Sequence, residues 1–106
     1  MDLGLSGARV LVTGASRGIG RAVAQVFAEE GAALALCARG AEALETASAE
    51  LMETGATVVA QTLDVTDHDA LPIFVDEAAR ALGGLDVLIS NVSGGGAPTP
   101  DQWQRG

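Results

Sequence analysis

The chain has 106 residues, a net charge of −8 and a pI near 4.3. This length suits one domain, and the acidic balance argues against binding nucleic acid or an anionic membrane surface, both of which favour basic faces. Hydrophobic residues make up 48% of the chain but aromatic residues only 3%, so the core must be built from Ala, Val, Leu and Ile.

Cys37 is the only cysteine, so no intramolecular disulfide exists and a reducing compartment is compatible. It falls in a predicted buried strand, which favours a core thiol over a reactive one. No apolar run reaches membrane-spanning length and no signal peptide is recognised, so a cytoplasmic protein is expected. The sequence contains no Tyr and no Lys, and all of its basic residues are arginines.

The first predicted elements are a strand, a glycine turn and a helix. Residues 9–13 form an apolar run without alternation, typical of a buried parallel strand. A helix follows, ends at Gly31, and is predicted to bury these residues at steps of three and four: Ile19, Ala22, Val23, Val26 and Phe27. A second strand is predicted over 33–37 and a second helix over 41–54.

The next elements continue the alternation. A β-branched strand is predicted over 57–63, and the turn after it leads into a third helix that Thr66 or Asp67 could cap. Pro72 is expected near the first turn of that helix, where proline costs least, and Gly83-Gly84 ends it. A fourth strand follows over 85–90. Glycines 94–96 indicate a loop, and 99–103 resembles the start of another helix.

Alternating strands and helices predict an α/β fold, a Rossmann-type doubly wound parallel sheet built with right-handed crossovers. The expected strand order is 3-2-1-4, with the sheet truncated after strand 4. Ligands of such sheets bind at the carboxyl ends of the strands, near the switch between strands 1 and 4.

The glycine segment 13–20 provides the strongest functional signal. It lies between a strand and a helix, where glycines let phosphate oxygens approach the backbone at a helix N-terminus. Strand 2 ends in Ala38-Arg39, without the acidic residue that would bind ribose hydroxyls and reject a 2′-phosphate. Arg17 lies in the turn. Two guanidiniums near one ribose favour NADP (NADPH) over NAD, because arginine grips a phosphate monoester bidentately. Alternatively, Arg39 merely starts a polar loop.

Polar residues also end strands 3 and 4. Asp64 can accept a hydrogen bond from an adenine amino group, or it can simply end the strand or help to cap the next helix. Asn91 lies where a nicotinamide ribose is expected, although it more readily holds the backbone of neighbouring strands. His68, beside two aspartates in a turn, is interpreted as a solvated histidine, because a metal site needs more ligands.

These residues resemble the N-terminal half of the short-chain dehydrogenase/reductase family. The matching segments are 13–20, 38–39, 64–65 and 86–91, and the resemblance covers essentially the whole chain. It implies an NADP-dependent oxidoreductase acting on a carbonyl or alcohol substrate. It also implies these cofactor-binding positions: Gly14, Ser16, Arg17, Gly18, Ile19, Gly20, Arg39, Asp64, Val65 and Asn91.

The chain departs from the family pattern in two places. The family's Asn-Asn-Ala-Gly motif is replaced here by Ser90-Asn91-Val92-Ser93, which leaves the path of this loop open. The family's catalytic serine and Tyr-x-x-x-Lys motif would lie beyond residue 106, and Ser93 comes too early to be that serine. No catalytic residue and no metal ligand is therefore assigned, and the 106 residues are expected to be inactive alone, as an incomplete NADP-binding domain.

Two functions compete. The chain is either part of an NADP-dependent oxidoreductase or a non-catalytic module that senses NADP or associates with another protein. Methyltransferases and flavoproteins are disfavoured, because they usually need an acidic residue where Arg39 stands. Strand 4 would form an exposed apolar edge, so association through it or a homo-oligomer is expected.

Overall fold

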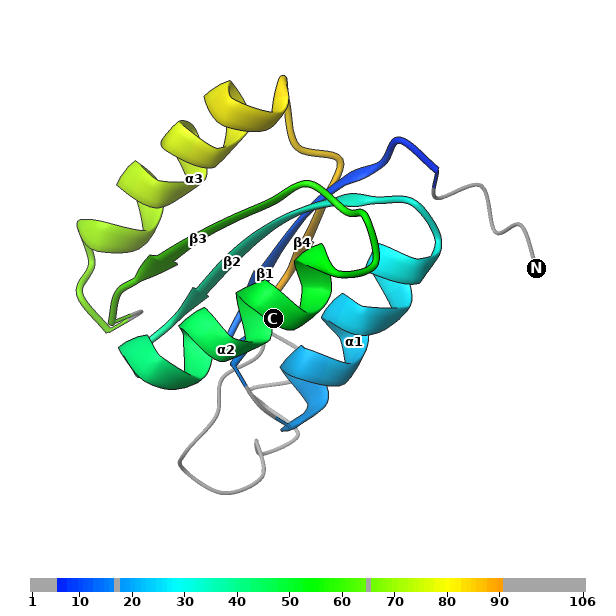
Figure 1. Ribbon diagram of the computed structural model, residues 1–106. Coiled ribbons are helices and arrows are strands. Elements are labelled where there is room, and N and C mark those ends of the chain that lie inside the picture. The colour runs from blue at the N-terminus through cyan, green and yellow to red at the C-terminus, as the bar shows by residue number, and fades with distance from the viewer. Residues whose placement is uncertain (1–5, 17, 65, 91–106) are drawn as a thin grey trace, which may run out of the picture.

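The computed structural model describes residues 6–16, 18–64 and 66–90, which form one parallel sheet covered by helices on both faces (Figure 1). In chain order the elements are β1 (Arg9–Thr13), α1 (Gly18–Glu29), β2 (Ala33–Ala38), α2 (Ala41–Met52), β3 (Val58–Thr62), α3 (Ala70–Leu82) and β4 (Val87–Ile89). The strands stand in the order β3-β2-β1-β4, as the sequence predicted.

The core consists of two layers, one on each face of the sheet. Val10 and Val12 of β1 face α1 and α2, whereas Leu11 between them faces α3, because successive side chains of a strand point to opposite faces. Figure 1 shows α1 and α2 together on one side of the sheet and α3 on the other. This arrangement leaves the carboxyl ends of β1, β2 and β3 at one common edge.

Helix α1 presents a different face to the sheet from the one the sequence predicted. Its buried residues are Gly20, Ala24 and Ala28, at steps of four, and Phe27 packs against the same core while only partly buried. By contrast, Ile19 is 75% exposed and Val26 53% exposed. Small residues on the buried face let the axis of α1 lie close to the sheet. The larger side chains of Ile19 and Val26 then lie on the outer side of the helix. The predicted burial of Ile19, Ala22 and Val26 is therefore wrong.

Strand β4 is shorter than predicted. Within the described ranges its one partner strand is β1, through Val10 with Val87, Leu11 with Leu88, and Val12 with Ile89. Asp86, the residue just before β4, connects the start of this strand to Arg9 of β1. This carboxylate accepts from the Arg9 backbone N–H at 2.9 Å and from Arg9 Nε at 3.1 Å. These bonds lower the pKa of Asp86, with the side-chain bond from Arg9 the largest cause. The loop and helix predicted over 94–103 lie outside the described residues.

The start of α3 also differs from the prediction. Pro72 lies in the first turn, as expected, but the residue at the N-terminal boundary is Asp69, and neither Thr66 nor Asp67 caps the helix. The Asp67 carboxylate instead accepts from the Asp69 backbone N–H at 3.0 Å, in the turn before α3. Within the part of the chain that the structure describes, no helix is long and apolar enough to cross a membrane.

Candidate nucleotide-binding site

The turn between β1 and α1 uses glycine at two positions of positive φ. Gly14 has φ 62° and Gly18 has φ 63°, in the left-handed region that other residues rarely adopt. Between them, Ala15 is fully buried, and its N–H donates to the Cys37 carbonyl of β2 at 3.3 Å. The turn is therefore fixed to the neighbouring strand.

The N-terminus of α1 opens toward solvent at this turn. A Cβ placed on Gly18 would meet no atom within 4 Å, so there is open space beside the first residue of the helix. The first turn carries no acidic residue. The first N–H groups of a helix lack partners within it and carry the positive end of the helix dipole. This end of α1 is thus suited to an anion, and the residues present fit a pyrophosphate.

The predicted glycine-turn residues play different parts. Gly14 and Ser16 are half-buried in the turn, and Ile19 lies exposed in the first turn of α1. Gly20 is buried in the first turn of α1. Three predicted cofactor positions, Arg17, Val65 and Asn91, lie outside the described residues.

Arg39 and Asp64 come together at the carboxyl ends of β2 and β3. The ladder continues past β3, because the Leu63 N–H donates to the Ala38 carbonyl at 2.9 Å. Arg39 follows Ala38 and Asp64 follows Leu63, so the two charged residues become neighbours. Arg39 Nε lies 3.9 Å from Asp64 Oδ2, and their side chains are 75% and 45% exposed. An ion pair this exposed contributes little to stability.

Thr66 is a member of this site that the sequence interpretation considered only as a helix cap. Its backbone N–H donates to Asp64 Oδ1 at 2.9 Å, and its hydroxyl donates to the same oxygen at 2.7 Å. These two bonds are the largest causes that lower the pKa of Asp64, and the attraction of Arg39 adds to them. The Asp-x-Thr spacing is the sequence signal that could have indicated this contact, because both residues favour such local bonds.

Neither Cys37 nor His68 adds chemistry to the site. Cys37 is buried in β2, and this burial raises the pKa of its thiol to about 11. The thiol is therefore protonated at neutral pH, as expected of a core cysteine. His68 is exposed in the turn before α3. Among the described residues, no group of three His, Cys, Asp or Glu side chains could hold a metal ion.

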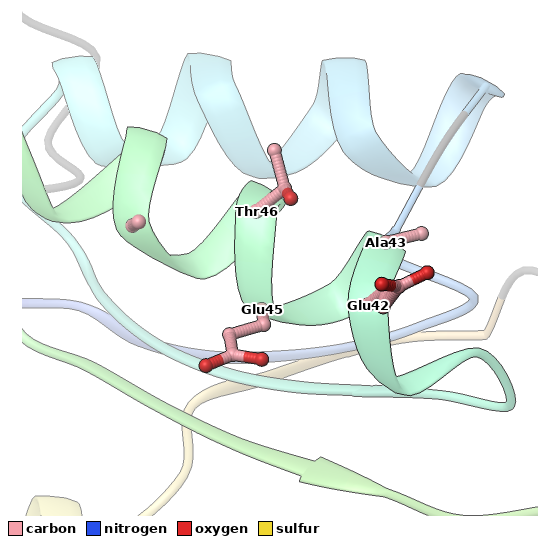
Figure 2. A pocket seen from close by; sticks show the side chains of 5 residues that line it. Glu42, Ala43, Glu45 and Thr46 are labelled. Carbon is pink, nitrogen blue, oxygen red and sulfur yellow. The ribbon is translucent and has the colours of Figure 1, made fainter.

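One surface depression among the described residues is acidic. It lies on α2 and is lined by Glu42, Ala43, Glu45, Thr46 and Ala49. Figure 2 shows the side chains of Glu45 and Thr46 pointing to different sides of the helix. Two carboxylates would repel a phosphate, so this depression is unsuited to a dinucleotide.

A glycine turn, the N-terminus of α1 and polar strand ends on one edge of a 3-2-1-4 sheet are typical of the Rossmann-type fold, whose ligands bind at this edge. The family model of short chain dehydrogenases matches residues 8–104. The chain therefore belongs to the short-chain dehydrogenase family.

Similar proteins include several dehydrogenases and reductases. Gluconate 5-dehydrogenase of Gluconobacter oxydans is 45% identical over 87 residues, which cover 82% of this chain and 34% of that protein. A short-chain dehydrogenase/reductase of Colletotrichum higginsianum is 40% identical over 90 residues, 85% of this chain and 34% of its own. The chain thus spans about a third of the length of these relatives.

Solved structures agree with this assignment. L-sorbose reductase of Gluconobacter frateurii, complexed with NADPH and L-sorbose, superimposes with a TM-score of 0.85 at 36% identity, over 96% of this chain and 39% of that one. A xylitol dehydrogenase bound to NAD⁺ gives a TM-score of 0.83 at 37% identity, over 95% and 41%. Relatives of this fold therefore include users of both cofactors.

Proposed function

We propose that residues 1–106 form the NADP-binding half of an oxidoreductase that moves a hydride between NADP and a small carbonyl or alcohol. The observation that carries this proposal is Arg39, which stands exposed at the carboxyl end of β2, where a NAD-specific site would have an acidic residue. Since the relatives bind either NADPH or NAD⁺, the preference is argued from this residue of the chain itself.

Different residues of the site would bind different parts of the cofactor. In this proposal the N-terminus of α1, with Gly14, Ser16 and Gly18, binds the pyrophosphate. Arg39 binds the 2′-phosphate on the adenosine ribose through its guanidinium, and Asp64 accepts from the adenine amino group. When bound, the nicotinamide supplies the hydride or accepts it.

In this proposal the proton donor lies outside these 106 residues. Reduction of a carbonyl needs a donor for the forming alkoxide, and the sequence contains neither Tyr nor Lys. We infer that the part of the protein corresponding to the other two-thirds of the relatives supplies this donor and the substrate pocket. We further propose a cytoplasmic location, as the sequence composition favours.

Association through β4 forms part of the same proposal. In the part of the chain that the structure describes, this strand has one partner strand and stands at the edge of the sheet, and Leu88 on it is 56% exposed. An edge strand with apolar side chains tends to pair with another strand. We propose that β4 pairs either with a later strand of the protein or with a second copy.

Calorimetric titration with NADPH and NADH tests the cofactor assignment. We expect NADPH to bind more tightly than NADH. Arg39→Ala should reduce the difference in binding free energy between the two cofactors by about 1.5–3 kcal/mol, the range of a charge-assisted hydrogen bond. The matched control is Arg80→Ala, which removes the same charge from the exposed face of α3 and should leave the preference unchanged. Equal affinities in the parent protein, or an unchanged ratio in Arg39→Ala, would refute the proposed cofactor.

A further inference from the structure

The two oxygens of the Asp64 carboxylate have unequal surroundings. Oδ1 accepts both donors of Thr66, at 2.9 and 2.7 Å, whereas Oδ2 faces Arg39 Nε at 3.9 Å. A carboxylate oxygen has about two lone-pair sites, so Oδ1 is fully used by Thr66. Oδ2 is thus the oxygen that remains able to accept.

This division limits how Arg39 can pair with Asp64. A bidentate pair would need both carboxylate oxygens and would occupy two guanidinium nitrogens. With Oδ1 held by Thr66, the contact is reduced to one long approach through Nε. In the described part of the chain, Arg39 has no other ion pair, so its terminal nitrogens remain open to a ligand at the sheet edge.

We propose that Thr66 is a positioning residue for cofactor selection: its hydroxyl holds the Asp64 carboxylate so that the Arg39 guanidinium stays available to a ribose phosphate. Without the hydroxyl, the carboxylate can turn and pair with Arg39 through both oxygens. A guanidinium paired in that way competes poorly for a phosphate. This inference rests on the proposed function, in which Arg39 selects NADP.

A purely local role for Thr66 makes a different prediction. If its hydroxyl only stabilised the turn before α3, removing it would lower the stability of the protein and weaken both cofactors alike. The ratio of the NADPH and NADH affinities is therefore the informative quantity, because only the proposed role acts on the phosphate contact.

The test uses Thr66→Val, which keeps the side-chain size and the backbone N–H but removes the hydroxyl, with Thr66→Ser as the matched control. We expect Thr66→Val to lower the ratio of NADPH to NADH affinity about three- to tenfold, the effect of one ordinary hydrogen bond. Loss of the Asp64 contact with adenine would weaken both cofactors alike and leave this ratio unchanged. Thr66→Ser should keep the parent ratio. In an Arg39→Ala background, Thr66→Val should leave the ratio unchanged.

Carboxyl NMR titration supplies a second readout that needs no cofactor. In an Arg39→Ala background, where no guanidinium can replace the lost hydroxyl, Thr66→Val should raise the pKa of Asp64 toward its ordinary value and Thr66→Ser should keep it low; with Arg39 present, the pKa should stay low in Thr66→Val, because the carboxylate then pairs with the guanidinium. An unchanged cofactor ratio in Thr66→Val, or an equal loss in Thr66→Ser, would overturn the role of Thr66 while the NADP assignment stands. Equal binding of NADPH and NADH by the parent protein would instead refute the proposed function, and this inference with it.

Discussion

A pair of substitutions on α1 discriminates between the helix face that the sequence predicted and the face that the structure buries. Ala24 is fully buried against the sheet, whereas Ala22, two residues earlier on the same helix, is exposed. Replacing each with Leu adds the same side chain to the same helix. Only the leucine at residue 24 must enter a packed layer, between α1 and the core residues of β1 and β2.

The expected magnitudes follow from this difference in burial. Ala24→Leu inserts three carbon atoms into a filled space, and overpacking of this kind costs about 1–3 kcal/mol of unfolding free energy. Ala22→Leu should change it by less than about 0.5 kcal/mol, as is usual for surface substitutions. Because α1 begins at the glycine turn, displacing the helix from the sheet should also weaken cofactor binding in Ala24→Leu.

Urea unfolding followed by circular dichroism measures both variants under identical conditions. For a domain of 60–100 residues, each kcal/mol corresponds to a Tm change of about 4–8 °C, so thermal scans provide an independent check. Equal effects at residues 22 and 24 would contradict the observed packing. A larger loss of unfolding free energy in Ala22→Leu than in Ala24→Leu would support the buried face that periodicity predicted.

Three further predictions concern activity, association and pH. The purified 106-residue protein should show no measurable reduction of ketones or aldehydes with NADPH, and turnover that survives removal of contaminating reductases would disprove the need for an external proton donor. Size-exclusion chromatography with light scattering should find association or instability, with slow hydrogen exchange over 87–89 in any associated species; a stable monomer with fast exchange there would count against pairing through β4. The pKa of Asp86 is lowered by Arg9, so its contribution to stability is present above the ordinary aspartate pKa and is lost as the pH falls through the lowered value. Asp86→Asn should therefore flatten the acid limb of the stability profile, and an unchanged limb would show that this ion pair does not stabilise the fold.

The sequence predicted the order of the elements well because each depends on local signals. The apolar run 9–13 matches β1 residue for residue, and Gly31 and Gly83 both follow helix ends with positive φ. The strand order followed from the Rossmann-type class of the alternating pattern rather than from any single residue. These features need no knowledge of which side chains meet.

The wrong face predicted for α1 concerns contacts between elements. The prediction for α1 placed the large hydrophobic residues Ile19 and Val26 in the core, because they are more hydrophobic than Gly20 and Ala24. In the structure the small residues are buried instead. The contact between Arg39 and Asp64 depends on the pairing of β2 with β3, which no local pattern specifies. The roles assigned to Arg17, Val65 and Asn91 remain predictions.

The position of Cys37 allows local opening of the fold to be measured by thiol labelling. The thiol lies in β2, between β1 and β3, within the layer covered by α3. A thiol reagent can reach it only after this layer separates, and exposure to water would return its pKa from about 11 toward the ordinary value. Because the sequence contains no other cysteine, the labelling rate reports how often the layer around Cys37 opens. A bound dinucleotide at the adjoining turn should slow that labelling, so cofactor occupancy becomes measurable without any substrate.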